Sequence, residues 1–254
     1  MTNPAYANND ILKMLYEKEV KRKKRDKPFS LVGEFGLLTA SGNTNTTTFK
    51  SSLTADHEMT KWSNKYFSEF IYKRNDGSGD RSGTVTAQRF LATVQLDYKL
   101  ATEKDRLFIY AEYDDDRFNG FRYQAAAAAG YSTIAWKNSD GQFRYSIGPG
   151  YSFSQKYEVD ESNESYFKTI KETIVRASLD YRYKMSEHAR FRQFFSAEAG
   201  EQNKRSRSET SLTTNLVDSL AMKFSFVMIY NEADFNLNDN LSTETSISLV
   251  YQFF

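Results

Sequence analysis

The sequence contains no cysteine, only 3 prolines and only 2 histidines among its 254 residues. Without cysteine, the chain has no disulfide, no thiolate ligand for zinc and no thiol nucleophile. It also lacks any apolar run near the roughly 18 residues that a membrane-spanning helix needs. A membrane-spanning β-strand needs only about ten residues with alternating faces, so this absence excludes helical spanning alone.

The charge of the chain is balanced, with 34 basic and 33 acidic residues and a net charge of +1. This balance gives no reason to expect a nucleic-acid partner. Aromatic residues, by contrast, are abundant, with 17 Tyr and 20 Phe but only 2 Trp. Tyr and Phe favour half-buried strands, and aromatic rings also collect at membrane interfaces.

Residues 1–28 differ from the rest and are expected to form a separate N-terminal periplasmic segment. Residues 5–7 read Ala-Tyr-Ala, like the end of a secretory signal, but no charged and apolar regions precede them. Residues 8–27 predict a short helix that ends in a basic cluster at residues 21–25. That cluster could contact anionic headgroups or a periplasmic partner, although a merely solvated cluster is the favoured interpretation.

From residue 29 onward, segments with period-two alternation are separated by polar turn clusters. Phe143, Tyr145 and Ile147 share one face of such a segment, while Arg144 and Ser146 occupy the other. We expect strands at residues 29–40, 44–58, 62–74, 85–100, 105–115, 121–136, 141–156, 167–184, 189–201, 207–219, 222–233 and 242–254. Their even number is the one that single-chain bacterial barrels prefer.

A water-soluble β-sandwich would also show alternation. The expected strands are longer than the five or six residues typical of globular proteins, and their polar faces are charged along their length. We therefore predict an all-β fold, a transmembrane antiparallel up-and-down β-barrel of about 12 strands at residues 29–254, in the bacterial outer membrane. The aromatic residues expected at the membrane interface are Tyr98, Tyr181, Tyr183, Tyr251 and Phe253.

The polar faces of the strands should line the lumen, where both signs of charge are mixed. The residues predicted to line it are Glu34, Lys50, Glu69, Arg89, Asp97, Glu112, Arg144, Arg176, Asp180, Arg182, Arg192 and Glu198. Such charges can line a small polar channel for ions or small solutes, or they can pair into a non-conducting structural or stress-response barrel. The sequence favours the narrow channel slightly, and we expect no cofactor.

Residues suited to catalysis or metal binding are few. His57 and His188 have no metal-ligating neighbour at strand or helix spacing, and no nucleophile elbow or nucleotide-binding loop is present. A hydrolase that uses His57 with Ser51 or Ser52 on the outward face is a minor alternative. The three aspartates at residues 114–116 could bind a divalent cation, but such a triplet at a loop is more often solvated. We predict no enzyme and no metal site.

Several short segments carry a family resemblance. They are residues 33–35 (Gly-Glu-Phe), 41–44 (Ser-Gly-Asn-Thr), 148–151 (Gly-Pro-Gly-Tyr), 176–181 (Arg-Ala-Ser-Leu-Asp-Tyr) and 249–254 (Leu-Val-Tyr-Gln-Phe-Phe). Together they resemble the YdiY-like family of salt-induced outer-membrane proteins, a domain of unknown function, over nearly all of residues 29–254. The resemblance implies an outer-membrane location and no catalytic residues.

The last strand resembles the aromatic-ended assembly signal of outer-membrane barrels, although Ser248 stands where that signal often has glycine. This resemblance implies the outer-membrane assembly machinery as a partner. The lipid bilayer and lipopolysaccharide are the other expected partners.

Overall fold

The computed structural model describes residues 28–40, 46–75, 83–102, 104–116, 121–159, 165–217, 219–232 and 241–253. The expected N-terminal helix and basic cluster lie outside these residues. The described part consists of twelve strands: β1 (Phe29–Ala40), β2 (Thr46–Glu58), β3 (Trp62–Asn75), β4 (Thr84–Lys99), β5 (Asp105–Asp116), β6 (Phe121–Lys137), β7 (Gly141–Val159), β8 (Ser165–Lys184), β9 (Ala189–Ala199), β10 (Lys204–Val217), β11 (Leu220–Asn231) and β12 (Leu241–Gln252). In this part of the chain, no helix is long and apolar enough to cross a membrane.

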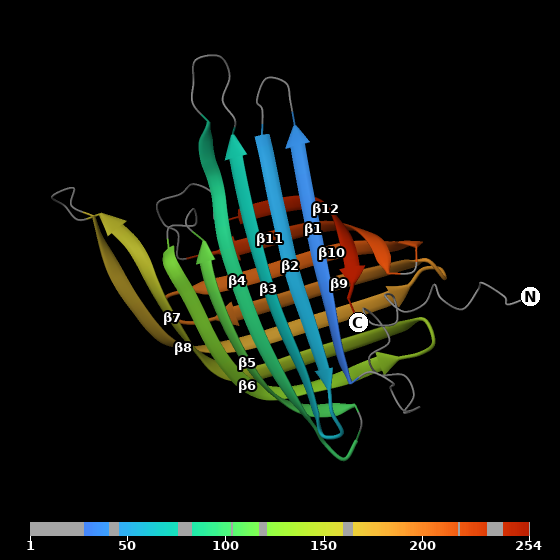
Figure 1. The fold of residues 1–254 in the computed structure, drawn as a ribbon. Helices are drawn as coiled ribbons and strands as arrows, with labels where there is room; N and C mark the ends of the chain where they lie inside the picture. Colours follow the sequence, from blue (N-terminus) through green and yellow to red (C-terminus); the bar gives the residue numbers. More distant parts are fainter. Residues whose placement is uncertain are drawn as a thin grey trace, which may run out of the picture.

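Each strand pairs antiparallel with the next in sequence, and β1 pairs with β12, so the sheet closes into a barrel (Figure 1). Closure pairs the two edges that an open sheet would expose. The predicted all-β, up-and-down barrel of twelve strands is therefore confirmed.

The ladders of the barrel differ in length. The described pairing of β1 with β12 covers four residue pairs, from Val32↔Gln252 to Phe35↔Leu249, whereas β1 pairs with β2 along its whole length. The β7–β8 hairpin is the longest. The pairing of β8 with β9 stops at Val175↔Ala199, whereas β8 itself begins at Ser165, so this part of the hairpin extends beyond β9. This hairpin projects from the barrel wall in Figure 1.

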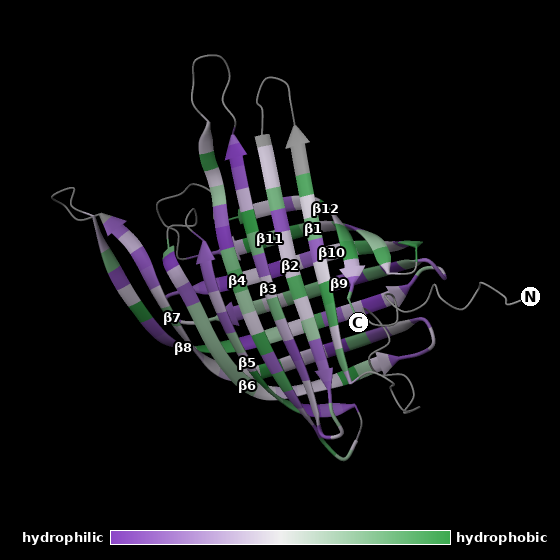
Figure 2. Cartoon of the chain, viewed as in Figure 1, coloured by the Kyte–Doolittle hydropathy of each residue, from purple (hydrophilic) through white to green (hydrophobic). Residues whose placement is uncertain are grey.

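Alternation along the strands gives the barrel an apolar outer face and a charged inner face. On β5, Leu107 and Ile109 are 50% and 53% exposed, whereas Arg106 and Asp114 on the opposite face are 3% and 2% exposed. Figure 2 shows the same alternation of apolar and polar residues along other strands. A water-soluble protein buries its apolar residues, whereas a membrane barrel turns them to lipid.

Two glycines allow β6 and β7 to approach closely. Gly130 and Gly148 lie between the residue pairs Ala128↔Gly150 and Tyr131↔Ile147 of the β6–β7 ladder. A Cβ atom added to Gly130 would lie 2.3 Å from the backbone oxygen of Ile147. Any side chain at this position would therefore push the two strands apart.

Candidate functional site: the ion-paired lumen

The twelve residues predicted to line the lumen lie on the inner face of the barrel. Each takes part in an ion pair, and none of their side chains is more than 30% exposed. Alternation places these charges inside because the intervening residues on each strand face outward. The lumen therefore holds a dense set of paired charges.

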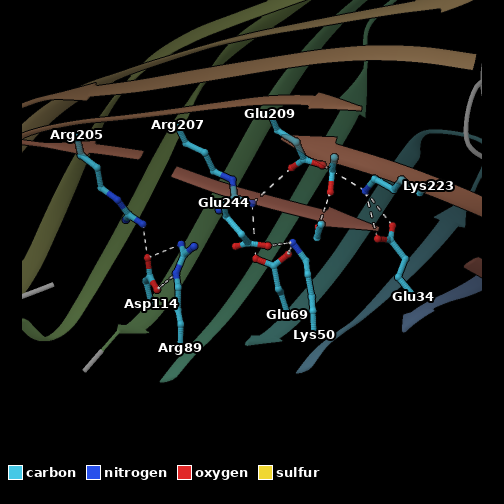
Figure 3. A network of polar contacts seen from close by, with 12 residues as sticks. Glu34, Lys50, Glu69, Arg89, Asp114, Arg205, Arg207, Glu209, Lys223 and Glu244 are labelled. Atoms are coloured by element: carbon cyan, nitrogen blue, oxygen red, sulfur yellow. Dashed lines mark hydrogen bonds and ion pairs between the residues drawn. The ribbon is translucent and has the colours of Figure 1, made fainter. Parts of the chain in front are cut away.

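One network of ion pairs runs through seven side chains of alternating sign (Figure 3). In order they are Glu244, Lys50, Glu69, Arg207, Glu209, Lys223 and Glu34, and the successive nitrogen–oxygen distances are 2.6, 3.2, 3.6, 3.4, 3.3 and 3.1 Å. These residues come from β12, β2, β3, β10, β11 and β1. The network therefore links six strands, including both strands of the β1–β12 seam.

A second network centres on Asp114 of β5. Its carboxylate accepts hydrogen bonds of 2.8 Å from both Nε and Nη2 of Arg89, and another from Arg205. Arg205 also donates through Nη1 to Glu112, at 2.6 Å. Paired, two-pronged contacts of this kind are the strongest geometry that arginine and carboxylate groups form.

Both networks join opposite walls of the barrel. In the ring of twelve strands, β10 lies five positions from β5 and five from β3, close to the six of a diametrical pair. Arg205 of β10 reaches Glu112 and Asp114 on β5, and Arg207 reaches Glu69 on β3. A further contact of this kind joins β11 to β6, where Nδ2 of Asn231 donates to Oε1 of Gln124 at 3.3 Å.

Little space remains where these side chains meet. The cavity bordered by Arg89, Glu112, Arg176, Glu198 and Arg205 has a volume of about 20 Å³. This is close to the smallest volume that holds one water molecule. A hydrated ion does not fit into that cavity while the side chains keep these positions.

Smaller clusters use the remaining predicted residues. The guanidinium of Arg176 lies 3.7 Å from the ring centroid of Tyr110 and pairs with Glu198. Asp180 pairs with Arg182 at 2.6 Å and with Arg192 at 3.0 Å, and Asp97 pairs with Arg106 at 3.7 Å and Arg144 at 3.6 Å. The paired charges thus extend beyond the two networks.

The networks contain residues that were not among those predicted to line the lumen: Asp114, Arg205, Arg207, Glu209, Lys223 and Glu244. Asp114 was interpreted as part of a solvated triplet at the start of a loop, although it continues the inward face of Glu112. In β10, serine and threonine occupy both faces, so the strand shows no contrast that would reveal which face is inward. Lys223 could have been found from the sequence, because it stands between the apolar residues Met222 and Phe224. Both of these neighbours are exposed on the outer face.

Aromatic side chains gather on the outer face at the end of the barrel where β4, β8 and β12 finish and β3 begins. The rings of Tyr181 and Tyr183 stack at 6.5 Å, and those of Tyr251 and Phe253 meet edge-to-face at 5.1 Å. The ring of Tyr98 lies 5.2 Å from that of Trp62. A position at a membrane interface remains the expectation for this set.

The alternative site at His57 has no catalytic geometry. The ring of His57 lies 6.0 Å from that of Phe29. Ser51 is six residues away on the same strand, roughly 20 Å at about 3.3 Å per residue, and the buried Ser52 is on the opposite face. These residues therefore do not form a serine–histidine pair.

The aspartate triplet also divides between two faces. Asp114 points inward to Arg89, while Asp115 lies on the other face and borders an outer pocket. Within the described residues, no group of three or more His, Asp or Glu side chains is arranged to hold a metal ion. The alternation of the strand thus separates carboxylates that are adjacent in sequence.

Comparison with known proteins agrees with the resemblance seen in the sequence. Residues 33–253 match the family described as Protein of unknown function, DUF481. The uncharacterized protein YdiY of Escherichia coli (strain K12) is 28% identical over 227 residues, which cover 89% of this chain and 83% of YdiY.

Two solved structures are similar to this chain over most of its length. The NanC porin is 10% identical, with a TM-score of 0.50, covering 89% of this chain and 100% of that one. An outer membrane channel from Pseudomonas putida F1 is 10% identical, with a TM-score of 0.49, covering 92% and 100%. At 10% identity, the similarity to the NanC porin concerns the fold alone. By its family match, the chain belongs to the DUF481 family, and the predicted YdiY-like relationship is confirmed.

Proposed function

We propose that this protein is a bacterial outer-membrane β-barrel whose lumen is closed at rest by ion pairs between its walls. Its role would be that of a non-conducting structural barrel of the envelope. The single observation that carries the proposal is the contact of Arg205 and Arg207 with carboxylates across the lumen.

Placement in a membrane is supported by the two faces of the wall. Ile109, Ile147 and Leu249 are about half exposed on the outer face, where water would make them costly. On the inner face, the twelve predicted lumen residues each form an ion pair within the protein. A closed barrel also pairs its backbone groups internally, as lipid requires.

Closure of the lumen is supported by the density of the pairs. Each bridging arginine contacts a carboxylate that is itself nearly buried, so water screens these pairs weakly. Opening a path would break several contacts together. The resting state of lowest free energy should therefore be the closed one.

A small polar channel for ions or small solutes is the second candidate. It is favoured by the fold shared with the NanC porin and by the nature of the ion-paired side chains that close the lumen. These groups are long, flexible side chains, which could move aside without any change in the strands.

Solute uptake by proteoliposomes distinguishes the two candidates. The refolded protein should first show the heat-dependent gel mobility of a folded barrel and should fractionate with the outer membrane in cells. Vesicles that contain it should then swell in small sugars no faster than empty vesicles. Swelling well above the empty-vesicle rate would refute the closed barrel and support the channel.

A further inference from the structure

A cavity of about 990 Å³ opens on the outer surface where β5 and β7 end and β6 and β8 begin. Its walls include Tyr113, Asp115, Arg122, Tyr123, Tyr157 and Phe167. Tyr113 is exposed, and Tyr113 and Asp115 flank the inward-pointing Asp114. The cavity therefore faces away from the lumen and is separate from the ion-pair networks.

Arg122 is the charged group that distinguishes this cavity. It is the extra residue of a β-bulge in β6, since Phe121 pairs with Lys156 and Tyr123 with Gln155. Bulges redirect side chains and often occur beside functional sites. The exposed guanidinium lies 5.4 Å from the ring centroid of Phe167 and donates through Nη1 to Gln155 at 3.5 Å.

Arg122 differs from the arginines inside the barrel. Arg89, Arg176 and Arg205 each pair with a carboxylate. Among the described residues, Arg122 has no ion pair with a carboxylate, although Asp115 borders the same cavity. Its charge is therefore available to an anionic ligand.

The cavity lies at one edge of the apolar outer surface of the barrel wall. On the outer face of β8, apolar Val175, Leu179 and Tyr183 give way toward the hairpin to Thr173, Lys171 and Thr169. Such a change from apolar to polar residues marks the headgroup level of a membrane. Lys171 is exposed and adds a second positive charge on this face.

We infer that this cavity binds the headgroup of a phosphorylated glycolipid in the surrounding leaflet. A phosphate would pair with Arg122, as guanidinium and phosphate form two-pronged hydrogen bonds. Sugar rings would lie against Tyr123, Tyr157 and Phe167, while Asp115 accepts hydrogen bonds from sugar hydroxyls. A carboxylate beside the arginine suits a ligand with hydroxyls better than a bare phosphate.

The size of the cavity agrees with a headgroup of this kind, because about 990 Å³ is at the upper end of small-molecule pockets. The inference rests on the proposed membrane placement but not on closure of the lumen.

Native mass spectrometry of the detergent-solubilised full chain tests the site. The probes are bisphosphorylated lipid A, the same lipid with its phosphates removed, and phosphatidylglycerol. The variant is Arg122→Gln, and the matched control is Lys204→Gln, an exposed cation at the start of β10, away from the cavity. Heat-dependent gel mobility verifies that each protein is folded.

Arg122→Gln should lower binding of bisphosphorylated lipid A roughly tenfold, the effect of one charge-assisted hydrogen bond. Lys204→Gln should leave it unchanged, and the dephosphorylated lipid should bind the wild type as weakly as lipid A binds the variant. Unchanged binding in Arg122→Gln, or equally tight binding of phosphatidylglycerol by the wild type, would overturn the inference and leave the barrel proposal intact. A wild-type chain that forms no heat-modifiable barrel would refute the membrane placement and this site together.

Discussion

Replacement of Asp114 by asparagine removes one charge from the centre of the second network without changing the shape of the side chain. Asp114 is 2% exposed and accepts two hydrogen bonds of 2.8 Å from Arg89. In the variant, Arg205 keeps its ion pair with Glu112, whereas Arg89 loses the carboxylate with which it pairs. Leaving one buried charge without its partner costs 3–5 kcal/mol, so we expect a loss of about 3 kcal/mol of unfolding free energy.

The adjacent residue supplies the control. Asp115→Asn removes the same charge one position along β5, on the outer face, and should change the unfolding free energy by less than about 0.5 kcal/mol. Urea unfolding of the protein folded into lipid vesicles measures both. The double variant Arg89→Met/Asp114→Leu should regain much of the loss, because it removes both charges together. Equal losses for the two aspartates would refute the assignment of faces.

Three further predictions concern the wall. Gly130→Ala should lower the unfolding free energy by about 1–3 kcal/mol, measured by urea unfolding, because its Cβ would meet the backbone oxygen of Ile147; a neutral result would contradict the close approach. Ile109→Lys should cost about 2–4 kcal/mol in lipid vesicles if this exposed residue faces lipid, and little if it faces water. Amides of residues 242–246 that point toward β1 should exchange hydrogen faster than those of residues 249–252, because the described seam pairing covers only four residue pairs; uniform exchange would contradict this.

The fold was predictable from the sequence because every strand turns one face to each environment. The expected and observed starts agree at residue 29 for β1, 62 for β3 and 141 for β7. The predicted and observed strand starts differ where the two faces of a strand carry residues of similar polarity. The start of β10 was expected at residue 207 but lies at Lys204, since lysine, arginine and serine there suit either a strand or a turn.

The site was predictable only in part, for a physical reason. Alternation reports which face a residue occupies, so it could assign Arg89 and Glu112 to the lumen. It carries no information on which charges meet across the lumen, because that depends on the tilt and diameter of the closed barrel. The contact of Arg207 with Glu69 joins residues on β10 and β3 and required the three-dimensional arrangement.

The cavity around Arg122 was missed because it depends on a bulge. A strict period of two would place Arg122 on the same face as Gln124, which is buried inside. The extra residue shifts this phase by one position, and a pattern of period two does not by itself reveal such an insertion, although Gly120 stands two positions before Arg122.

The most direct test of the central claim is single-channel conductance of the refolded protein in a planar bilayer, for the wild type and for Arg205→Ala/Arg207→Ala. Removing both guanidinium groups takes away the contacts of β10 with β5 and β3. The account predicts no discrete conductance steps for the wild type and small, reproducible steps for the double variant. Wild-type steps as large as those of the variant would contradict a lumen closed by ion pairs.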